Sequence, residues 1–353
     1  MSSHKNQGKG GEFARGFFTP FVLDRVMRRV LHVGPCDTPG GMATVMQTLA
    51  EFPPEGWQAD LLASHAPGGL WAKWRAYRRA RCELIRRCRS STERPNLVHV
   101  HTASDWSWRR KARLVRVSQR YNIPVVVHIH SGGFSDWLGK PSSRRCRRVR
   151  SLLDHPGVNG VTLHKAWSDH LRDQLGDLLH VENPVVVVGK GVSMDRDSHH
   201  LLLMGRLDPV KGHDFAIKVG ELLRMDFPDL QMTVTGLETS SHKWVHAKGW
   251  VEEEEKRELF EKASLLLIPS AYEGQPMVML EALAHGLPVC VSDRLIGLPQ
   301  HVGVARYGDL DHWVVTVKSI IRNPPSQTNL EDAVRPFSIV HLQPKWGEIY
   351  DAS

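Results

Sequence analysis

The stretch Leu265-Leu266-Leu267-Ile268-Pro269-Ser270-Ala271-Tyr272-Glu273-Gly274-Gln275-Pro276-Met277-Val278-Met279-Leu280-Glu281 joins an apolar, strand-like run to an apolar, helix-compatible run. Its two glutamates are eight positions apart, which in a continuous α-helix is a little over two turns, or about 12 Å. We expect Glu273 on the loop at the mouth of the helix and Glu281 two turns along it, both reaching one extended ligand. The amides of Gly274, Gln275 and Met277 lie where the helix begins, and free N–H groups there bind anionic or hydroxyl-rich groups. Taken alone, the pair also fits one loop carboxylate and one solvated helix residue.

The chain has 353 residues, a length that favours two domains over a single core. Hydrophobic residues make up 41% of it, as in folded soluble proteins, and no run approaches the eighteen or so apolar residues of a membrane span. The Phe-rich start is interrupted by Arg15, Pro20 and Asp24, which argues against a signal peptide. The five cysteines are scattered and form no C-x-x-C pair, so we expect reduced thiols in a cytoplasmic protein.

Charge is distributed unevenly along the chain. Residues 1–183 hold 29 Lys and Arg against 15 Asp and Glu, a net charge of +14, whereas residues 184–353 hold 17 against 23, a net charge of −6. A basic half joined to an acidic half predicts that the first docks on an anionic partner. An anionic membrane surface is the favoured candidate, and we expect no nucleic-acid partner because no recognition module accompanies the charge.

Short apolar runs alternate with amphipathic segments throughout the chain. In the first half, strands are predicted at Val30–Val33, Ala59–Leu62, Leu97–Val100, Val125–Ile129 and Val158–Leu163, with helices near 42–51, 71–89, 108–121 and 165–175. The pattern breaks around 181–184 and restarts. In the second half, strands are predicted at Leu201–Met204, Met232–Thr235, Leu265–Ile268 and Pro288–Val291, with helices near 212–224, 253–263, 276–285 and 309–322.

This alternation predicts two Rossmann-like, doubly wound α/β domains with a ligand-binding cleft between them, at the carboxyl ends of the strands. We expect a disordered tail over residues 1–24, a first domain over 25–183 and a second over 184–335.

A basic loop, Gly205-Arg206-Leu207-Asp208-Pro209-Val210-Lys211-Gly212, follows the first strand of the second domain. The planar guanidinium of Arg206 and the mobile ammonium of Lys211 suit a diphosphate, and a helix that starts near Lys211 adds its positive end. Surface charges on a βα loop produce the same pattern. The two-glutamate segment in the same domain favours the diphosphate site.

The first domain offers a counterpart in the loop Gly34-Pro35-Cys36-Asp37-Thr38-Pro39-Gly40-Gly41-Met42. Gly40 and Gly41 allow its backbone to approach a phosphate or a sugar closely. The loop is not G-x-G-x-x-G, so the dinucleotide fingerprint is absent.

His130 ends the run Val127-His128-Ile129-His130 and precedes Ser131-Gly132-Gly133, a position suited to hydrogen bonding with a ligand. His99 and His101 repeat the H-x-H spacing, and two such strands also fit a metal-dependent hydrolase. No ordered set of further His and Asp ligands follows them, and no convincing D-x-D site is present, so we expect no metal.

Together these elements resemble the family-4 type of retaining glycosyltransferases with the GT-B fold, a group with many enzymes of polysaccharide and lipid-linked sugar assembly. The resemblance covers nearly the whole chain from about Val30. It is most specific at Gly205-Arg206 with Lys211-Gly212, at Glu273-Gly274 through Glu281-Ala282, and at Gly286 to Val289.

The resemblance implies that Arg206 and Lys211 hold the diphosphate of a nucleotide-sugar donor and that Glu281 binds its ribose hydroxyls. Glu273 and the amides after it address the sugar, and His130 contacts the sugar near the reacting centre. The expected catalytic residues are therefore His130, Arg206, Lys211 and Glu273, and the expected donor-binding residues are Gly40, Gly41, Gly205, Gly274, Gln275, Met277, Glu281 and Trp250.

It further implies that the Gly40-Gly41 loop closes over the phosphates and the acceptor, that Trp250 lies near the base, and that residues 336–353 form a helix crossing back onto the first domain. Gln275 and Pro276 replace the commoner aromatic residue and glycine of the family, and Gln300 stands where a glutamate is frequent. These departures leave the nucleobase and the sugar of the donor open.

The implied reaction transfers the sugar to a hydroxyl of a glycan or polyprenyl-linked acceptor with retention, by front-face attack assisted by the departing phosphate. Arg206, Lys211 and the helix amides can stabilise the leaving diphosphate, so we expect neither a metal nor a cofactor. We expect a role in cell-surface polysaccharide or glycolipid assembly. A catalytically silent GT-B partner subunit is the main alternative, and the metal-dependent hydrolase is a weaker one.

The segment Trp71–Arg89 is rich in arginine and tryptophan. Its apolar residues at largely helical spacing are Trp71, Trp74, Tyr77, Leu84, Ile85 and Cys88. Such a helix suits an anionic membrane interface, although a core-packing helix with a solvated basic face has the same pattern. A second cluster, Arg144-Arg145-Cys146-Arg147-Arg148, favours the membrane. We therefore expect a cytoplasmic protein, peripheral on the inner face of the membrane.

Overall fold

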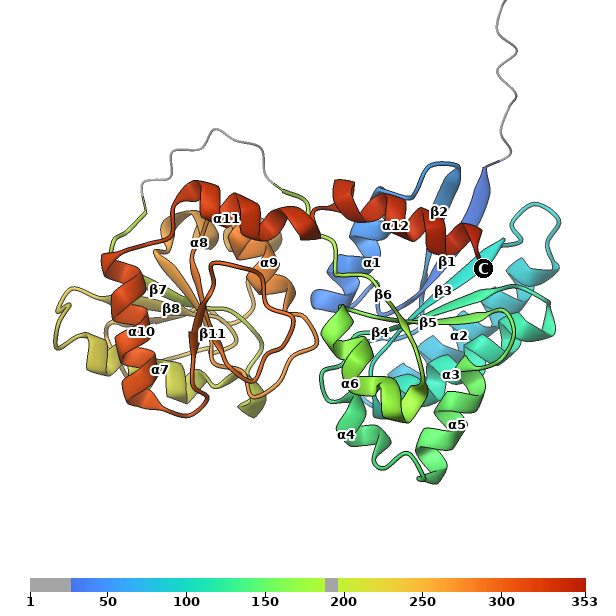
Figure 1. Ribbon diagram of the computed structural model, residues 1–353, viewed down its shortest axis with the longest axis horizontal. Helices are drawn as coiled ribbons and strands as arrows, with labels where there is room; N and C mark the ends of the chain where they lie inside the picture. The colour runs from blue at the N-terminus through green and yellow to red at the C-terminus, as the bar shows by residue number, and fades with distance from the viewer. Residues whose placement is uncertain (1–26, 188–195) are drawn as a thin grey trace, which may run out of the picture.

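The computed structural model describes residues 27–187 and 196–353. They form two α/β domains, each built on a parallel six-stranded sheet with flanking helices (Figure 1). The strand order is β2-β1-β3-β4-β5-β6 in the first sheet and β12-β11-β10-β7-β8-β9 in the second. This confirms the prediction of two doubly wound α/β domains. The predicted tail, residues 1–24, lies outside the described residues.

The strands follow the apolar runs of the sequence. Those of the first domain are β1 (Arg28–Gly34), β2 (Trp57–Ala63), β3 (Leu97–Thr102), β4 (Val125–Ile129), β5 (Val158–Thr162) and β6 (Leu179–His180). Those of the second are β7 (His200–Leu203), β8 (Gln231–Val234), β9 (Val245–Ala247), β10 (Leu265–Ile268), β11 (Val289–Ser292) and β12 (Gly303–Ala305). Nine strands lie within two residues of their predicted positions. The three that the sequence pattern does not indicate, β6, β9 and β12, are edge strands of two or three residues.

The helices between the strands are also close to their predicted positions. In the first domain they are α1 (Gly41–Glu51), α2 (Leu70–Arg89), α3 (Asp105–Arg120), α4 (Phe134–Leu138), α5 (Arg144–Leu153) and α6 (Lys165–Leu175). Then follow η1 (Pro209–Lys211), α7 (His213–Leu223), α8 (Glu253–Lys262), α9 (Met277–Ala284), α10 (Leu310–Arg322), α11 (Gln327–Val334), η2 (Arg335–Phe337) and α12 (Ile339–Asp351). One prediction was wrong in detail: because α9 begins only at Met277, Glu281 lies about one turn into the helix and not two.

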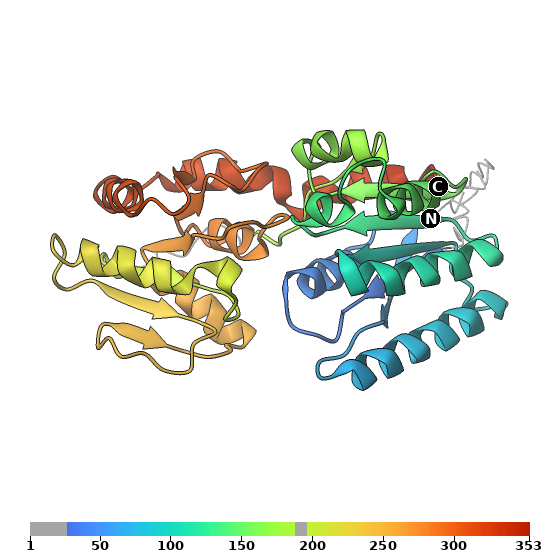
Figure 2. The same ribbon diagram turned by 90° about the horizontal axis from the view of Figure 1, so that it is seen from below.

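The two faces of the first sheet differ in composition. Figure 2 shows α2 and α3 on one side of this sheet and α12 on the other. The α2/α3 side is covered by apolar side chains such as Leu31, Val98 and Val127. On the opposite face, the parallel register pairs His32 with His99 and His101 with His128. Buried parallel strands are usually apolar on both faces, so this row of histidines is unusual.

The last helix, α12, lies against the first domain although α11 before it lies over the second (Figure 1). The hydroxyl of Tyr350 is 2.8 Å from His99 Nδ1, and the indole N–H of Trp57 donates to Asp351 Oδ1 over 3.0 Å. Trp346 is fully buried over the histidine-bearing face. The end of the chain therefore completes the core of the domain that contains its beginning.

Within residues 27–187 and 196–353, no helix combines the length and the apolar character needed to cross a bilayer. All five cysteines are free thiols, and Cys82 is the exposed one.

Candidate active site

The loop after β4 meets the loop after β10. A methyl group added to Gly132 would collide with the carbonyl of Glu273, and one added to Gly274 would collide with the carbonyl of His130. Glycine is needed at both positions because two backbones approach each other there. The structure thus brings His130 and Glu273, predicted from different halves of the chain, to one junction between the domains.

A second contact joins the glycine loop of the first domain to the start of α9. A Cβ atom on Gly41 would lie 3.1 Å from Met277 Cγ. Gly40 precedes α1 as its N-cap with φ of 142°, a backbone conformation that side chains other than glycine rarely adopt. The N-terminus of α9 has no side-chain cap and no acidic residue in its first turn. Its amides therefore remain suited to an anionic or hydroxyl-bearing ligand.

The loop before α9 is held in place by the first domain and the connection between the domains. Trp167 Nε1 donates to the carbonyl of Gly274 over 3.0 Å. The backbone N–H of Asn183 donates to Gln275 Oε1 (2.6 Å), and Asn183 Nδ2 donates to the backbone carbonyl of Gln275 (3.1 Å). The Gln275 side chain is thus buried against Asn183, and only its backbone remains for the predicted donor contact.

Lys211 and Glu273, predicted to serve different parts of the donor, form an ion pair with each other. Glu273 Oε1 also accepts a hydrogen bond of 3.0 Å from Ser270 Oγ. Both charged side chains are partly buried, so water screens the pair less than a surface ion pair. Lys211 ends η1, and α7 starts two residues later at His213. The ammonium group is thereby held beside the loop that meets His130.

Glu281 forms a similar pair with Lys256 of α8. Lys256 Nζ is 3.2 Å from Glu281 Oε1 and 2.6 Å from Glu253 Oε2. The Lys256 and Glu281 side chains are 16% and 13% exposed. Burial raises the pKa of Glu281, and the nearby Lys256 opposes that rise. The sequence does not predict Lys256 as a site residue, because its proximity to Glu281 arises only when α8 packs beside α9.

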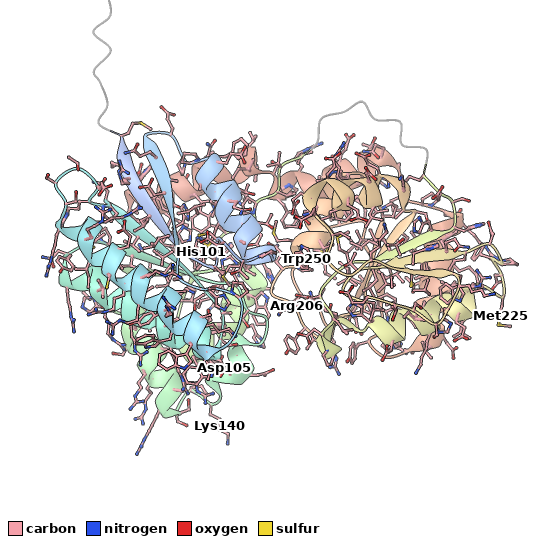
Figure 3. All side chains as sticks on the ribbon, turned by 180° about the vertical axis from the view of Figure 1, so that it is seen from behind. His101, Asp105, Lys140, Arg206, Met225 and Trp250 are labelled. Atoms are coloured by element: carbon pink, nitrogen blue, oxygen red, sulfur yellow. The ribbon has the colours of Figure 1, made fainter. Side chains whose placement is uncertain are left out.

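Arg206 and Trp250 lie on the edge of the second domain nearest the first (Figure 3). The Arg206 side chain is 78% exposed, and its Nε is 3.8 Å from Asp208 Oδ2. Trp250 is also exposed. Gly205 donates its backbone N–H to Thr235 Oγ1 over 2.8 Å, which fixes the base of the Arg206 loop. The guanidinium and the indole are therefore both accessible to a ligand.

Two family models match the chain: residues 39–196 match "Glycosyltransferase Family 4" and residues 198–323 match "Glycosyl transferases group 1". The chain belongs to glycosyltransferase family 4. Among curated relatives, glycogen synthase of Mycobacterium tuberculosis is 26% identical over 273 residues, covering 69% of this chain. A D-inositol 3-phosphate glycosyltransferase of Pseudarthrobacter chlorophenolicus is 28% identical over 159 residues, 39% of this chain and 38% of its own length. The chain spans 64% of the length of the mycobacterial enzyme.

Solved structures confirm the GT-B fold of this chain. Sucrose-phosphate synthase from Thermosynechococcus elongatus aligns with a TM-score of 0.68 at 14% identity, covering 92% of this chain and 98% of that one. HepE of Anabaena, solved in complex with UDP, aligns with a TM-score of 0.65 at 14% identity, covering 92% and 100%. Starch synthase IV of Arabidopsis thaliana, bound to ADP and acarbose, aligns with a TM-score of 0.65 at 11% identity, covering 92% and 99%.

The first domain holds a cluster of basic residues that the sequence pattern did not indicate. Lys111 of α3 is 2% exposed, and no described acidic residue forms an ion pair with it. Burial, and secondarily the charge of Arg110, lowers the pKa of Lys111 to about 7. Burial and the charges of Arg110, Lys111 and Lys73 lower the pKa of His65 to about 4. At neutral pH His65 is therefore uncharged, whereas Arg110 and the protonated form of Lys111 repel each other, so an anion would stabilise this pair.

Histidines of β1, β3 and β4, with His130 directly after β4, form two triplets whose nitrogen atoms lie within 4.8 Å of one another: His32, His99 and His101, and His101, His128 and His130. A metal ion must lie near the ring plane of each imidazole that binds it. In the first triplet the ring planes differ by only 18° to 37° and the centroids are 4.2 to 5.3 Å apart. In the second triplet the planes differ by 30° to 47°. Two of the nitrogen–nitrogen contacts, His32 to His101 and His101 to His130, are 3.0 Å long and link these histidines by hydrogen bonds.

Proposed function

We propose that this family-4 enzyme transfers a sugar, with retention, from a nucleotide-diphosphate sugar to a hydroxyl of a glycan or polyprenyl-linked acceptor. The observation that carries the proposal is the ion pair of Lys211 and Glu273 at the junction where Gly132 and Gly274 bring the two domains together. The UDP and ADP bound to HepE and to starch synthase IV support a nucleotide-linked donor. The role proposed is assembly of a cell-surface polysaccharide or glycolipid.

In this proposal Lys211 and Arg206 stabilise the negative charge that grows on the diphosphate as it leaves. Lys211 is paired with the carboxylate of Glu273, and its ammonium group can bind a phosphate of the donor beside that carboxylate. The exposed Arg206 side chain can bind the other phosphate. The uncapped N-terminus of α9 adds free amides near the same point. These donors can stabilise the leaving group by themselves, so the proposed reaction is independent of a metal.

The other predicted residues have proposed roles in binding the donor. Glu281, one turn into α9 and paired with Lys256, would accept hydrogen bonds from the ribose hydroxyls. Trp250 would stack on the base from its exposed position on the second domain. His130 and the Glu273 loop would contact the sugar, and the Gly40-Gly41 loop would cover the phosphates.

The experiment is nucleotide release from a panel of UDP-, GDP- and ADP-sugars, with and without a polyprenyl-linked acceptor. Lys211→Ala and Arg206→Ala should each lower kcat by about 10²-fold, the usual scale for losing a transition-state donor. Lys218→Ala, an exposed lysine on α7, is the matched control and should retain full activity. Near-normal turnover in both active-site variants contradicts the assignment. No turnover of any donor by the intact chain supports the silent partner subunit, and stoichiometric zinc in the purified protein supports the hydrolase.

We also propose that the acceptor side of the enzyme meets an anionic membrane surface. Trp71, at 76% exposure, and Trp74 form an exposed aromatic pair on α2, whereas Leu84 and Cys88 at the other end of the helix are buried. The predicted apolar stripe is therefore divided between solvent and core. A hollow of about 640 Å³ is lined by Arg116, Arg144, Arg147 and Arg148, and no described acidic residue forms an ion pair with these four side chains.

Exposed indoles and unpaired arginines are the features that bind anionic bilayers. Vesicles with anionic lipid should bind the protein at low salt and release it at high salt, whereas neutral vesicles should bind much less. The variant Arg147→Gln/Arg148→Gln should weaken the binding, and Arg257→Gln on α8 is the control. Binding that does not depend on lipid charge contradicts this part of the proposal.

A further inference from the structure

Three histidines on the α12-covered face of the first sheet form a hydrogen-bonded chain that ends at the candidate active site. His32 Nδ1 is 3.0 Å from His101 Nε2, and His101 Nδ1 is 3.0 Å from His130 Nε2. His32 comes from β1, His101 from β3, and His130 directly follows β4. His32 and His101 are fully buried, and His130 is partly exposed at the junction with the second domain. Each nitrogen of His101 is engaged, so its ring orientation is fixed from both sides.

Burial keeps these imidazoles neutral. It lowers the pKa of His32 and of His130 to about 3 and lowers that of His101 well below its ordinary value. A neutral imidazole carries one N–H and one lone pair, so it donates at one nitrogen and accepts at the other. In a chain of three neutral rings the two hydrogen bonds must therefore run in the same direction. Only two arrangements exist, with the protons displaced toward His130 or toward His32.

The buried end of the chain decides between these arrangements. His32 Nε2 is buried, and no described residue offers it a hydrogen-bond partner. If the chain pointed toward His32, this nitrogen would carry an unpaired N–H, whereas in the opposite direction it is an unpaired lone pair. Unpaired buried N–H groups are the rarer of the two in folded proteins. The favoured direction is thus His32 Nδ1–H to His101 Nε2, and His101 Nδ1–H to His130 Nε2.

We infer that His32 and His101 are positioning residues that hold His130 as the Nδ1–H tautomer, so that His130 donates a hydrogen bond to an oxygen of the donor sugar. Because Nε2 of His130 is occupied by His101, only Nδ1 remains for the ligand, and no described residue forms a hydrogen bond with it. The direction of the chain makes that nitrogen a donor and not an acceptor. The inference rests on the proposed function for the identity of the ligand but not for the tautomer.

The neighbouring histidines provide a matched control. His128 lies on the same face, is fully buried, and stacks on His130 with ring centroids 4.0 Å apart. Neither of its ring nitrogens has a hydrogen-bond partner among the described residues. His128→Phe therefore changes the packing around His130 but leaves the hydrogen-bonded chain intact.

The test is nitrogen-15 NMR of the histidine rings in the full chain without substrate, where protonated and unprotonated ring nitrogens have well-separated shifts. The His130 signals are assigned by their loss in His130→Gln. We expect Nδ1–H at His130 in the wild type, in His128→Phe and in His101→Asn, because the asparagine amide nitrogen takes the place of the imidazole Nδ1 and still donates to His130. In His101→Phe no side chain donates to Nε2 of His130, so the proton of His130 should move from Nδ1 to Nε2.

Turnover gives a second readout. His101→Phe should lower kcat about tenfold, the value of one neutral hydrogen bond, with little change in KM for the donor, and His101→Asn should restore most of it. If His101→Phe does not fold, His32→Phe serves instead, since it removes the end that sets the direction and should give a mixture of tautomers at His130. An Nε2–H tautomer in the wild type, or an unchanged Nδ1–H tautomer in His101→Phe or His32→Phe, overturns the inference. A wild type that turns over no donor refutes the proposed function and leaves the tautomer result intact.

Discussion

Replacing Lys111 with methionine should stabilise the ligand-free protein at pH 7. The amine is 2% exposed without an acidic partner, and burial lowers its pKa from 10.5 to about 7. A difference of about 3.5 pKa units corresponds to about 5 kcal/mol at 1.36 kcal/mol per unit. Methionine has a similar length and no charge, and replacing buried charges by apolar groups typically stabilises by about 1–4 kcal/mol. We therefore expect a gain of about 3 kcal/mol for Lys111→Met.

The gain should depend on pH in a defined direction. The folded pKa of Lys111, about 7, lies below the unfolded value of 10.5. Between these values the unfolded chain binds the proton and the folded protein does not, so the wild type becomes more stable as pH rises from about 7 to 10.5. Below pH 7 both states are protonated and the full cost of the buried charge is present. The advantage of Lys111→Met should thus be largest at pH 7 and below, and small at pH 10.

The assay is differential scanning calorimetry at pH 7 and pH 10, in which we expect a separate transition for each domain. A gain of about 3 kcal/mol should raise the Tm of the first domain by about 6–12 °C at pH 7. Lys218→Met, at an exposed site on α7, is the control and should leave both transitions unchanged. An equal shift at both pH values, or no shift at pH 7, refutes the account of Lys111. Pyrophosphate should raise the Tm of the wild type more than that of Lys111→Met, because an anion relieves the same repulsion.

Burial lowers the pKa values of five histidines below the unfolded value of 6.5: His32, His99, His101, His128 and His130. Below pH 6.5 the unfolded chain therefore takes up as many as five protons that the folded protein does not bind, so the free energy of unfolding should be greatest above pH 6.5 and fall steeply toward pH 5. A Tm that stays constant between pH 7 and pH 5 would contradict this. Gly274→Ala should destabilise the protein by about 1–3 kcal/mol in a urea titration and lower turnover, because its methyl group would collide with the His130 carbonyl. Gly133→Ala, whose nearest neighbour would be 3.7 Å away, should leave the urea midpoint unchanged. Lys256→Ala should destabilise the protein by about 2 kcal/mol, because it leaves the buried Glu281 unpaired. The control Arg257→Ala, on the exposed side of α8, should change the stability by less than about 1 kcal/mol. Equal effects of the two substitutions would show that the pair of Lys256 and Glu281 contributes no more than a surface ion pair.

The sequence predicts those parts of the fold that a local pattern determines. The apolar run Leu265–Ile268 is β10 with the same bounds, because a buried parallel strand needs apolar residues on both faces. The strand β12 is not predicted, since three residues carry too little pattern and its place depends on pairing with β11. Helix α5 is not predicted, because half of its residues are arginines and the apolar spacing from Cys146 to Val149 is too short a pattern to indicate a buried face.

The candidate site shows the same division. Lys211 and Glu273 are predicted from their loops and neighbouring strands, and the structure shows that they are paired with each other. The Gln275 side chain is bound by Asn183, and Glu281 is paired with Lys256. Both contacts arise from packing between elements that are distant in the sequence, so the sequence pattern does not predict them. Lys111 occupies an ordinary helical position in the sequence, and its burial becomes evident only when α3 is packed in the domain.

The position of α12 has a consequence for synthesis of the chain. As the ribosome releases the first domain, its sheet emerges with the histidine-bearing face uncovered, because Trp346 and Tyr350 are the last of its core residues to be made. Domains that are complete in one stretch of chain can fold as soon as they emerge. Here the first domain must wait until the second has been translated. Until then water and other proteins in the cell have access to the imidazoles of His32, His99, His101 and His128, which are fully buried in the folded protein.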